Sequence, residues 1–109
     1  MFGRVPEISV EELKTLRDEG APIVLVDVRE PHETAISDLP GSVKIPLGTL
    51  PQSLEKVGKQ DVVVVYCRTG GRSATAVQFL LANGYPKVRN LVGGINRWAE
   101  AVDPSMQKY

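Results

Sequence analysis

The only cysteine of the chain lies in a loop that also carries two arginines and two glycines. Cys67 follows the apolar run 62–66, and the chain continues Arg68-Thr69-Gly70-Gly71-Arg72. A thiol attacks and carries sulfur well only as the thiolate, so its solution pKa of about 8.5 must be lowered. Arginines keep their charge at any relevant pH, and glycines let successive N–H groups turn toward one centre. The loop therefore predicts a reactive thiolate in an anion-binding site.

A helix predicted over 73–85 follows this loop directly. The unpaired N–H groups at a helix N-terminus attract negative charge, and Ser73 can cap the helix or donate its hydroxyl to a bound anion. A free cysteine is more often a small buried hydrophobic residue, but such a residue gains nothing from neighbouring arginines and glycines. We therefore assign Cys67 as the catalytic residue. The candidate substrate-binding residues are Arg68, Thr69, Gly70, Gly71, Arg72 and Ser73.

The elements that position this loop are short strands alternating with helices. A capping box at Ser9 and Glu12 predicts the first helix, and Gly20 and Pro22 end it. This order predicts one α/β domain over 1–109, built on a mostly parallel sheet. After a short extended piece at the start, the predicted strands are 23–29, 42–47, 61–66 and 88–94. The further predicted helices are a turn before Pro40, the segment 50–58 with Pro51 at its first position, 73–85 with Gly84 at its end, and 95–102.

Candidate residues follow two of these strands where each strand ends. Asp27 and Arg29 come at the end of one strand, and Cys67 follows the next long strand. Ligands of parallel α/β sheets bind beyond the carboxyl ends of the strands, so we expect these side chains to lie near one another. Asp27 and Arg29 have two interpretations: a structural ion pair that supports the loop, or an Arg29 that lines the pocket entrance.

The composition excludes several classes of partner. Thirteen basic and thirteen acidic residues give no net charge, which argues against nucleic acid as the main partner. We expect no membrane association, because no apolar run reaches the roughly 18 to 20 residues of a bilayer span. One cysteine and no Cys/His cluster predict no metal and no cofactor. A free thiol and the lack of a secretory signal predict a cytoplasmic location.

The segment "YCRTGGRS" resembles the active-site loop of the rhodanese family of sulfurtransferases. The segments "VDVREPHE", "LPGSVKIPL" and "LVGGINRW" resemble further landmarks of that family, in the same order. The resemblance implies a rhodanese-like fold, in which helices flank both faces of a five-stranded sheet. It also implies a persulfide on Cys67, cradled by the amides from Arg68 to Ser73.

One segment departs from the usual pattern of single-domain members. Many carry Gly-His-Ile before the proline and glycine, where this chain has Ser37-Asp38-Leu39. The segments "ISDLPGSVKIPL" and "VDPSMQKY" are more similar to the rhodanese domain fused behind adenylyltransferases of the molybdopterin and thiamine sulfur-carrier pathways. The chain is then a free-standing relative or an excised domain.

The loop length distinguishes sulfur transfer from phosphoryl transfer within this fold. A phosphatase-type loop has five residues between cysteine and arginine, whereas four lie between Cys67 and Arg72. The shorter loop favours a single sulfur atom over a phosphate. We expect sulfur to pass from an anionic donor, thiosulfate or a persulfide, to cyanide, a thiol or a sulfur-carrier protein. The alternatives are a non-catalytic binding module and a redox-sensing thiol protein.

Other conspicuous residues have structural interpretations. His32 is the only histidine, and we expect it to face solvent rather than to activate Cys67, which the arginines and amides can do without a base. Gly93 and Gly94 are too few for a dinucleotide fingerprint and predict a tight turn. Ile95 and Trp98 are expected to pack in the core.

Overall fold

The computed structural model describes residues 4–109, and its strands form one five-stranded sheet. The spatial order is β1-β5-β4-β2-β3, and the four pairings between neighbours are all parallel. The predicted five-stranded, mostly parallel α/β sheet is therefore confirmed. The strands are β1 (Glu7–Ile8), β2 (Val24–Asp27), β3 (Val43–Lys44), β4 (Val63–Tyr66) and β5 (Val88–Leu91).

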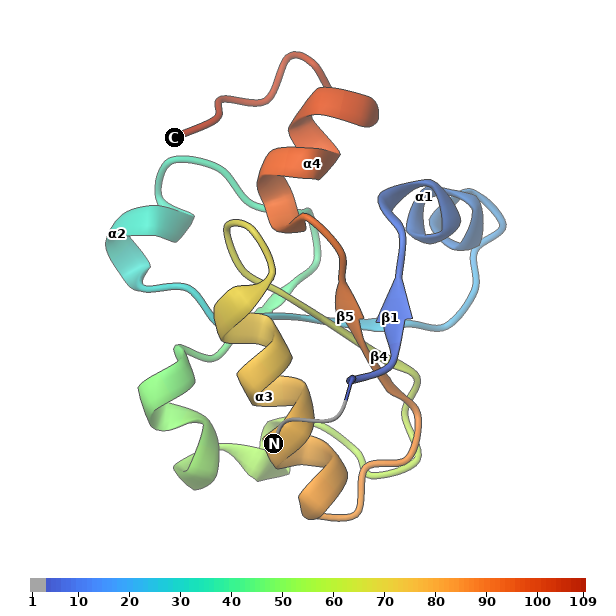
Figure 1. Ribbon diagram of the computed structural model, residues 1–109, viewed down its shortest axis with the longest axis vertical. Coiled ribbons are helices and arrows are strands. Elements are labelled where there is room, and N and C mark those ends of the chain that lie inside the picture. The colour runs from blue at the N-terminus through green and yellow to red at the C-terminus, as the bar shows by residue number, and fades with distance from the viewer. Residues whose placement is uncertain (1–3) are drawn as a thin grey trace.

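Helices cover both faces of the sheet (Figure 1). On one face, α3 packs on the strands together with two short 3₁₀ helices, and on the other face α1 and α4 pack side by side. None of the helices in the described part of the chain is both long and apolar enough to cross a bilayer. The helices are α1 (Val10–Asp18), α2 (Pro31–Thr34), η1 (Leu47–Gln52), η2 (Leu54–Lys56), α3 (Gly71–Ala82) and α4 (Gly94–Ala101).

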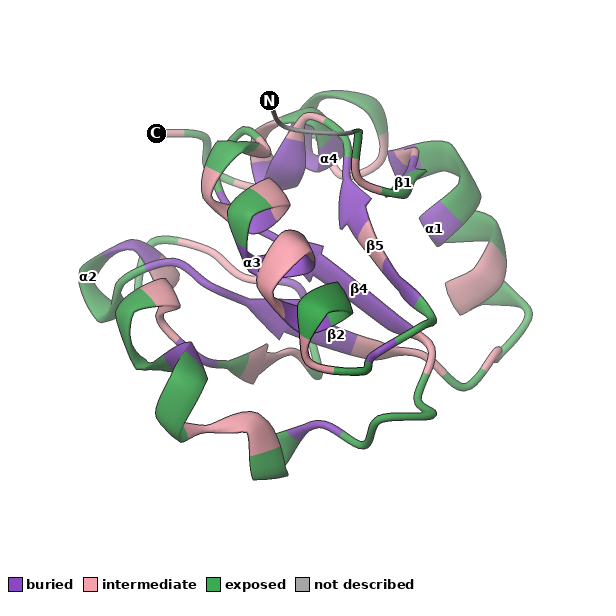
Figure 2. Ribbon diagram, turned by 60° about the horizontal axis from the view of Figure 1, so that its bottom comes forward, coloured by how far each residue is buried: buried purple, intermediate pink, exposed green. Residues whose placement is uncertain are grey.

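The central strand β4 is buried along its whole length (Figure 2). Val63 and Val65 pack in the cluster under α3, whereas Val64 and Tyr66 pack in the cluster under α1 and α4. A strand that is covered on both faces reads as a continuous apolar run, which is why "VVVVY" predicted it. Since both neighbours of β4 are also buried, the residue that follows Tyr66 has a fixed position.

Two local signals for helix ends are confirmed, the capping box at Ser9 and the glycine that follows α3. The hydroxyl of Ser9 accepts from the Glu12 N–H at 3.0 Å, and the Glu12 carboxylate accepts from the Ser9 N–H at 3.2 Å. After α3 the chain turns at Gly84, whose φ of 88° is readily adopted only by glycine. Ile95 and Trp98 are buried in the core as expected.

The prediction of a helix with Pro51 at its first position is wrong. The 3₁₀ helix η1 begins at Leu47, and Pro51 lies inside it. Its i→i+3 bonds include Thr49 N–H to the Pro46 carbonyl at 2.8 Å. Pro51 has no N–H to donate, so the segment does not continue as an α-helix and breaks into two short turns.

Candidate functional site

Cys67 directly follows β4, at the carboxyl edge of the sheet. In the register of this edge, Tyr66 pairs with Asp27 on β2, and Val65 pairs with Asn90 on β5. The Cys67 side chain is only 2% exposed. The sheet therefore holds one thiol at its centre, with polar residues on both neighbouring strands.

The loop after Cys67 curls around the sulfur atom. Gly70 has a φ of 112°, a left-handed conformation that only glycine adopts easily, and it is the N-cap of α3. This turn aims the Gly70 N–H at Cys67 Sγ, with a nitrogen–sulfur distance of 3.1 Å. The helix begins at Gly71, two residues earlier than predicted, because the turn at Gly70 already starts it.

Ser73 therefore lies inside the first turn of α3 and does not cap the helix. Its side chain is fully buried, with Oγ 3.4 Å from Cys67 Sγ and 2.5 Å from Asn90 Oδ1. The Asn90 amide in turn donates from Nδ2 to the Gly70 carbonyl at 3.1 Å. The hydroxyl carries one proton, so it donates either to Asn90 or to the sulfur.

The pKa of Cys67 lies below its ordinary value. Burial raises the pKa of this thiol, but hydrogen bonds to the sulfur lower it by more. The donors are the Ser73 hydroxyl and the backbone N–H groups of Ser73, Gly70 and Thr69. Hydrogen bonds to the charged form stabilise the thiolate of this buried residue.

The two loop arginines have aromatic or acidic partners. Arg72 donates to both oxygens of Glu33 on α2, at 2.6 and 2.7 Å, and these bonds hold the pKa of Glu33 well below its usual range. The exposed Arg68 places its Cζ atom 5.1 Å from the centre of the Tyr109 ring. The sequence predicted free positive charge around the thiolate, but the charge of Arg72 is largely compensated by Glu33.

Asp27 and Arg29 form a buried ion pair at the end of β2. Both side chains are 0% exposed, and Arg29 Nη2 lies 2.8 Å from Asp27 Oδ2. The same nitrogen donates to the Ser37 carbonyl at 2.6 Å. A fully buried guanidinium does not line an entrance, so the geometry favours loop support over a pocket-lining Arg29.

The sequence matches a known family over most of its length. The family model described as "Rhodanese-like domain" matches residues 9–101. The chain belongs to the rhodanese-like family. A protein of Allochromatium vinosum named "Sulfurtransferase" is 38% identical over 95 residues, which cover 87% of this chain and 89% of that relative.

Two further comparisons place this rhodanese-like domain among fused and free-standing relatives. It is 36% identical to the Zea mays "Adenylyltransferase and sulfurtransferase MOCS3-2" over 109 residues, which cover 94% of this chain but 23% of that protein. The crystal structure of a rhodanese-like domain protein from Staphylococcus aureus superposes with a TM-score of 0.83, at 34% identity, and covers 95% of this chain and 98% of that one. The rhodanese-like fold and the rhodanese-like family of this chain are thus established.

The roles of four residues at the site of this rhodanese-like domain were not predicted from the sequence. Asn90 interrupts an apolar strand, which was a usable signal for a polar role. Glu33, Gly94 and Tyr109 gave no such signal, because their roles arise from contacts with the Cys67 loop that only the fold creates.

Gly94 lets the start of α4 approach the backbone of the Cys67 loop closely. A Cβ atom at this position would lie 2.5 Å from the carbonyl oxygens of both Cys67 and Arg68. The next two amides donate to these carbonyls, Ile95 to Cys67 at 3.0 Å and Asn96 to Arg68 at 3.1 Å. The predicted turn at residues 93–94 is present, and the helix that follows it also binds the backbone of the Cys67 loop.

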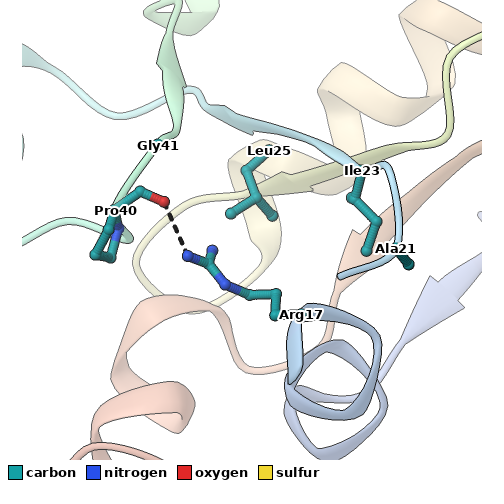
Figure 3. A pocket seen from close by; sticks show the side chains of 6 residues that line it. All are labelled: Arg17, Ala21, Ile23, Leu25, Pro40 and Gly41. Atoms are coloured by element: carbon teal, nitrogen blue, oxygen red, sulfur yellow. Dashed lines mark hydrogen bonds between the residues drawn. The ribbon is translucent and has the colours of Figure 1, made fainter. Parts of the chain in front are cut away.

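Two other features of the described chain, His32 and a hollow beside α1, do not belong to the Cys67 loop. His32 is exposed on α2. Within residues 4–109 no three His, Cys, Asp or Glu side chains lie together in a way that could hold a metal ion. A separate hollow lies beside α1, where Arg17 donates to the Pro40 carbonyl at 2.9 Å (Figure 3). None of the residues that line it belongs to the loop 67–73.

Proposed function

We propose that Cys67 carries sulfane sulfur as a persulfide between an anionic donor and a thiophilic acceptor. The observation that carries this proposal is the placement of the sulfur among hydrogen-bond donors. The Gly70 N–H lies 3.1 Å from Sγ, and the Ser73 hydroxyl and two further amides help to lower the thiol pKa. Preorganised N–H donors stabilise negative charge in a water-poor site better than water does.

In the first half-reaction the Cys67 thiolate attacks the outer sulfur of the donor. With thiosulfate, a bond forms between Sγ and that sulfur, the sulfur–sulfur bond of thiosulfate breaks, and sulfite leaves with the electron pair. The terminal sulfur of the new persulfide carries the negative charge. The amides of Gly70, Thr69 and Ser73 are the groups that would receive it.

In the second half-reaction an acceptor removes the terminal sulfur. Cyanide attacks it through carbon, the sulfur–sulfur bond breaks, thiocyanate leaves, and the Cys67 thiolate is restored. A thiol or the terminus of a sulfur-carrier protein takes the same place in other versions of the reaction. Because Cys67 is 2% exposed, the acceptor must present a slender nucleophile. We expect the reaction to occur in the cytoplasm, where thiols stay reduced.

The loop size supports sulfur over phosphate as the transferred group. Four residues separate Cys67 from Arg72, and the Arg72 guanidinium is held on both oxygens of Glu33. A phosphoryl-transfer loop needs its arginine to bind two oxygens of the phosphate. Here the same donors are engaged by a carboxylate, which leaves the amides as the groups directed at the sulfur.

Steady-state turnover of thiosulfate and cyanide tests this function. We expect ping-pong kinetics in the wild type, and loss of at least about a thousandfold in kcat/KM in Cys67→Ser, because the nucleophile forms the covalent intermediate. His32→Asn, which changes an exposed residue of the neighbouring helix, is the matched control and should retain full activity.

The same assay separates the alternatives. A binding module would show no turnover in wild type, which would contradict the proposal. A redox-sensing thiol would also fail to turn over, but it would consume one equivalent of hydrogen peroxide at Cys67. Equal activity in wild type and Cys67→Ser would contradict a persulfide mechanism, because the chain has no other thiol.

A further inference from the structure

Tyr109 reaches the Cys67 loop from the segment that follows α4. In Figure 1 this segment returns from α4 toward α2, and the loop after β4 lies between these helices. The Tyr109 ring contacts two guanidinium groups, with Arg68 Cζ 5.1 Å and Arg29 Cζ 5.7 Å from the ring centre. A cation above an aromatic face is attracted by the ring quadrupole.

The phenolic hydroxyl of Tyr109 joins the two ion pairs of the site. It accepts from Arg29 Nη1 at 2.9 Å and donates to Glu33 Oε2 at 2.8 Å. Glu33 in turn holds Arg72. Tyr109 is thus tied through its hydroxyl to the scaffold under the loop, while its ring is available to the exposed Arg68.

The Tyr109 ring is the partner of the Arg68 guanidinium. It follows Cys67 directly, its side chain is exposed, and within residues 4–109 its guanidinium makes neither a salt bridge nor a side-chain hydrogen bond. An arginine side chain in solvent samples many rotamers. The attraction of the Tyr109 ring, 5.1 Å from Arg68 Cζ, favours one position of this side chain over the others.

We propose that Tyr109 is a positioning residue for anionic sulfur donors, because its ring holds the Arg68 guanidinium at the Cys67 loop. This inference rests on the proposed sulfurtransferase function. It assigns the ring and the hydroxyl different tasks: the ring orients Arg68, and the hydroxyl anchors Tyr109 on Arg29 and Glu33. Donor binding should therefore depend on an aromatic residue at position 109.

The test compares Tyr109→Leu with Tyr109→Phe in the thiosulfate–cyanide assay. We expect Tyr109→Leu to raise the KM for thiosulfate by about two- to fivefold, the range of an exposed cation–π contact, with kcat unchanged. The KM for cyanide should change less than the KM for thiosulfate, because the attacking cyanide ion carries one negative charge and thiosulfate carries two. Tyr109→Phe keeps the ring, so its KM for thiosulfate should stay closer to wild type than that of Tyr109→Leu.

A double-mutant cycle with Arg68→Met examines whether the two residues act together. Arg68→Met alone should raise the KM for thiosulfate, and adding Tyr109→Leu should raise it no further. Additive effects, or an unchanged KM in Tyr109→Leu, would overturn the inference. A fall in kcat with KM unchanged would also overturn it, because that pattern points to general distortion of the site.

Two controls keep the result interpretable. If Tyr109→Leu does not fold, as judged by circular dichroism, Tyr109→Trp and Tyr109→Phe replace it. Both lack the phenolic hydroxyl, and the stronger quadrupole of tryptophan must then give the lower KM. Absence of turnover in wild type would count against the proposed function itself, whereas wild-type turnover with a KM independent of residue 109 counts only against the role of Tyr109.

Discussion

Two strand-to-helix turns with nearly the same local geometry lie at the carboxyl edge of the sheet. One joins β4 to α3 through Gly70, and the other joins β5 to α4 through Gly93. Each of these glycines is an N-cap with a left-handed φ, 112° and 79°. At both turns the first N–H groups of a helix have no partner within the helix and can donate to a neighbouring group.

The two turns differ in the atoms that accept hydrogen bonds from those N–H groups. In the first turn the Gly70 N–H points at Cys67 Sγ. In the second turn the amides of Ile95 and Asn96 bind the carbonyls of Cys67 and Arg68. The second turn thus supports the first. The N–H groups at a helix N-terminus can stabilise a thiolate only where backbone carbonyls do not already accept their hydrogen bonds. This holds at the first turn and not at the second.

Substitution of Gly94, where the second turn contacts the backbone of the first, should have the largest effect. In Gly94→Ala the new Cβ meets the backbone of residues 67–68, and φ is 61°, so we expect a loss of at least about 2 kcal/mol in the free energy of unfolding. The surviving folded protein should have strongly reduced kcat/KM. Urea unfolding and the thiosulfate–cyanide assay measure the two effects.

Gly71→Ala is the matched control on the other turn. No atom lies within 4 Å of a Cβ built there, so stability should change by less than about 0.5 kcal/mol. Equal losses of stability in the two alanine variants would contradict the supporting role of the second turn.

Removal of the side chain that links strand β5 to the first turn should have the next largest effect. Asn90 on β5 binds the Gly70 carbonyl and the Ser73 hydroxyl, and it is almost fully buried. We expect Asn90→Ala to lower the free energy of unfolding by about 1–3 kcal/mol, because buried polar partners lose their hydrogen bonds.

A substitution of Arg89, the neighbouring residue on β5, provides the control. Arg89→Ala alters a half-exposed residue of β5 and should leave both stability and activity near wild type. If Asn90→Ala retains wild-type stability, the hydrogen bonds between β5 and the first turn contribute no net free energy.

A smaller effect, on the pH dependence, is expected from Ser73→Ala. The hydroxyl of Ser73 helps to lower the pKa of Cys67 below its ordinary value. Its removal raises this pKa, so the acidic limb of kcat/KM for thiosulfate should move to higher pH, with activity reduced below the limb and retained above it. Thr75→Ala, at an exposed position of the same helix, should leave the profile in place. A limb that does not move would exclude the hydroxyl as a stabiliser of the thiolate.

Much of the fold and the position of the thiol could be predicted from local sequence. The run before Cys67 and the capping box at Ser9 report interactions within a few residues. The start of α3 was misplaced because Ser73 resembles an N-cap, whereas Gly70 adopts the left-handed turn that begins the helix. Pro51 was misplaced for a similar reason, since a 3₁₀ helix already begins at Leu47.

The partners of the arginines could not be predicted from the sequence. Arg72 and Glu33 are 39 positions apart, and Arg29 and Tyr109 are 80 positions apart. Only the parallel sheet brings these segments to one edge. Their charges in the sequence suggested a positive loop, but in the fold the acidic and aromatic partners compensate and orient them.

The central claim is that Cys67 carries sulfur, and the mass of the intact protein tests it most directly. Wild-type protein incubated with thiosulfate and desalted should gain the mass of one sulfur atom, located on Cys67 by peptide mapping. Addition of cyanide should remove this mass and release one equivalent of thiocyanate, and Cys67→Ser should gain nothing. A wild-type protein that turns over thiosulfate and cyanide but never gains a sulfur atom that cyanide removes would contradict the account.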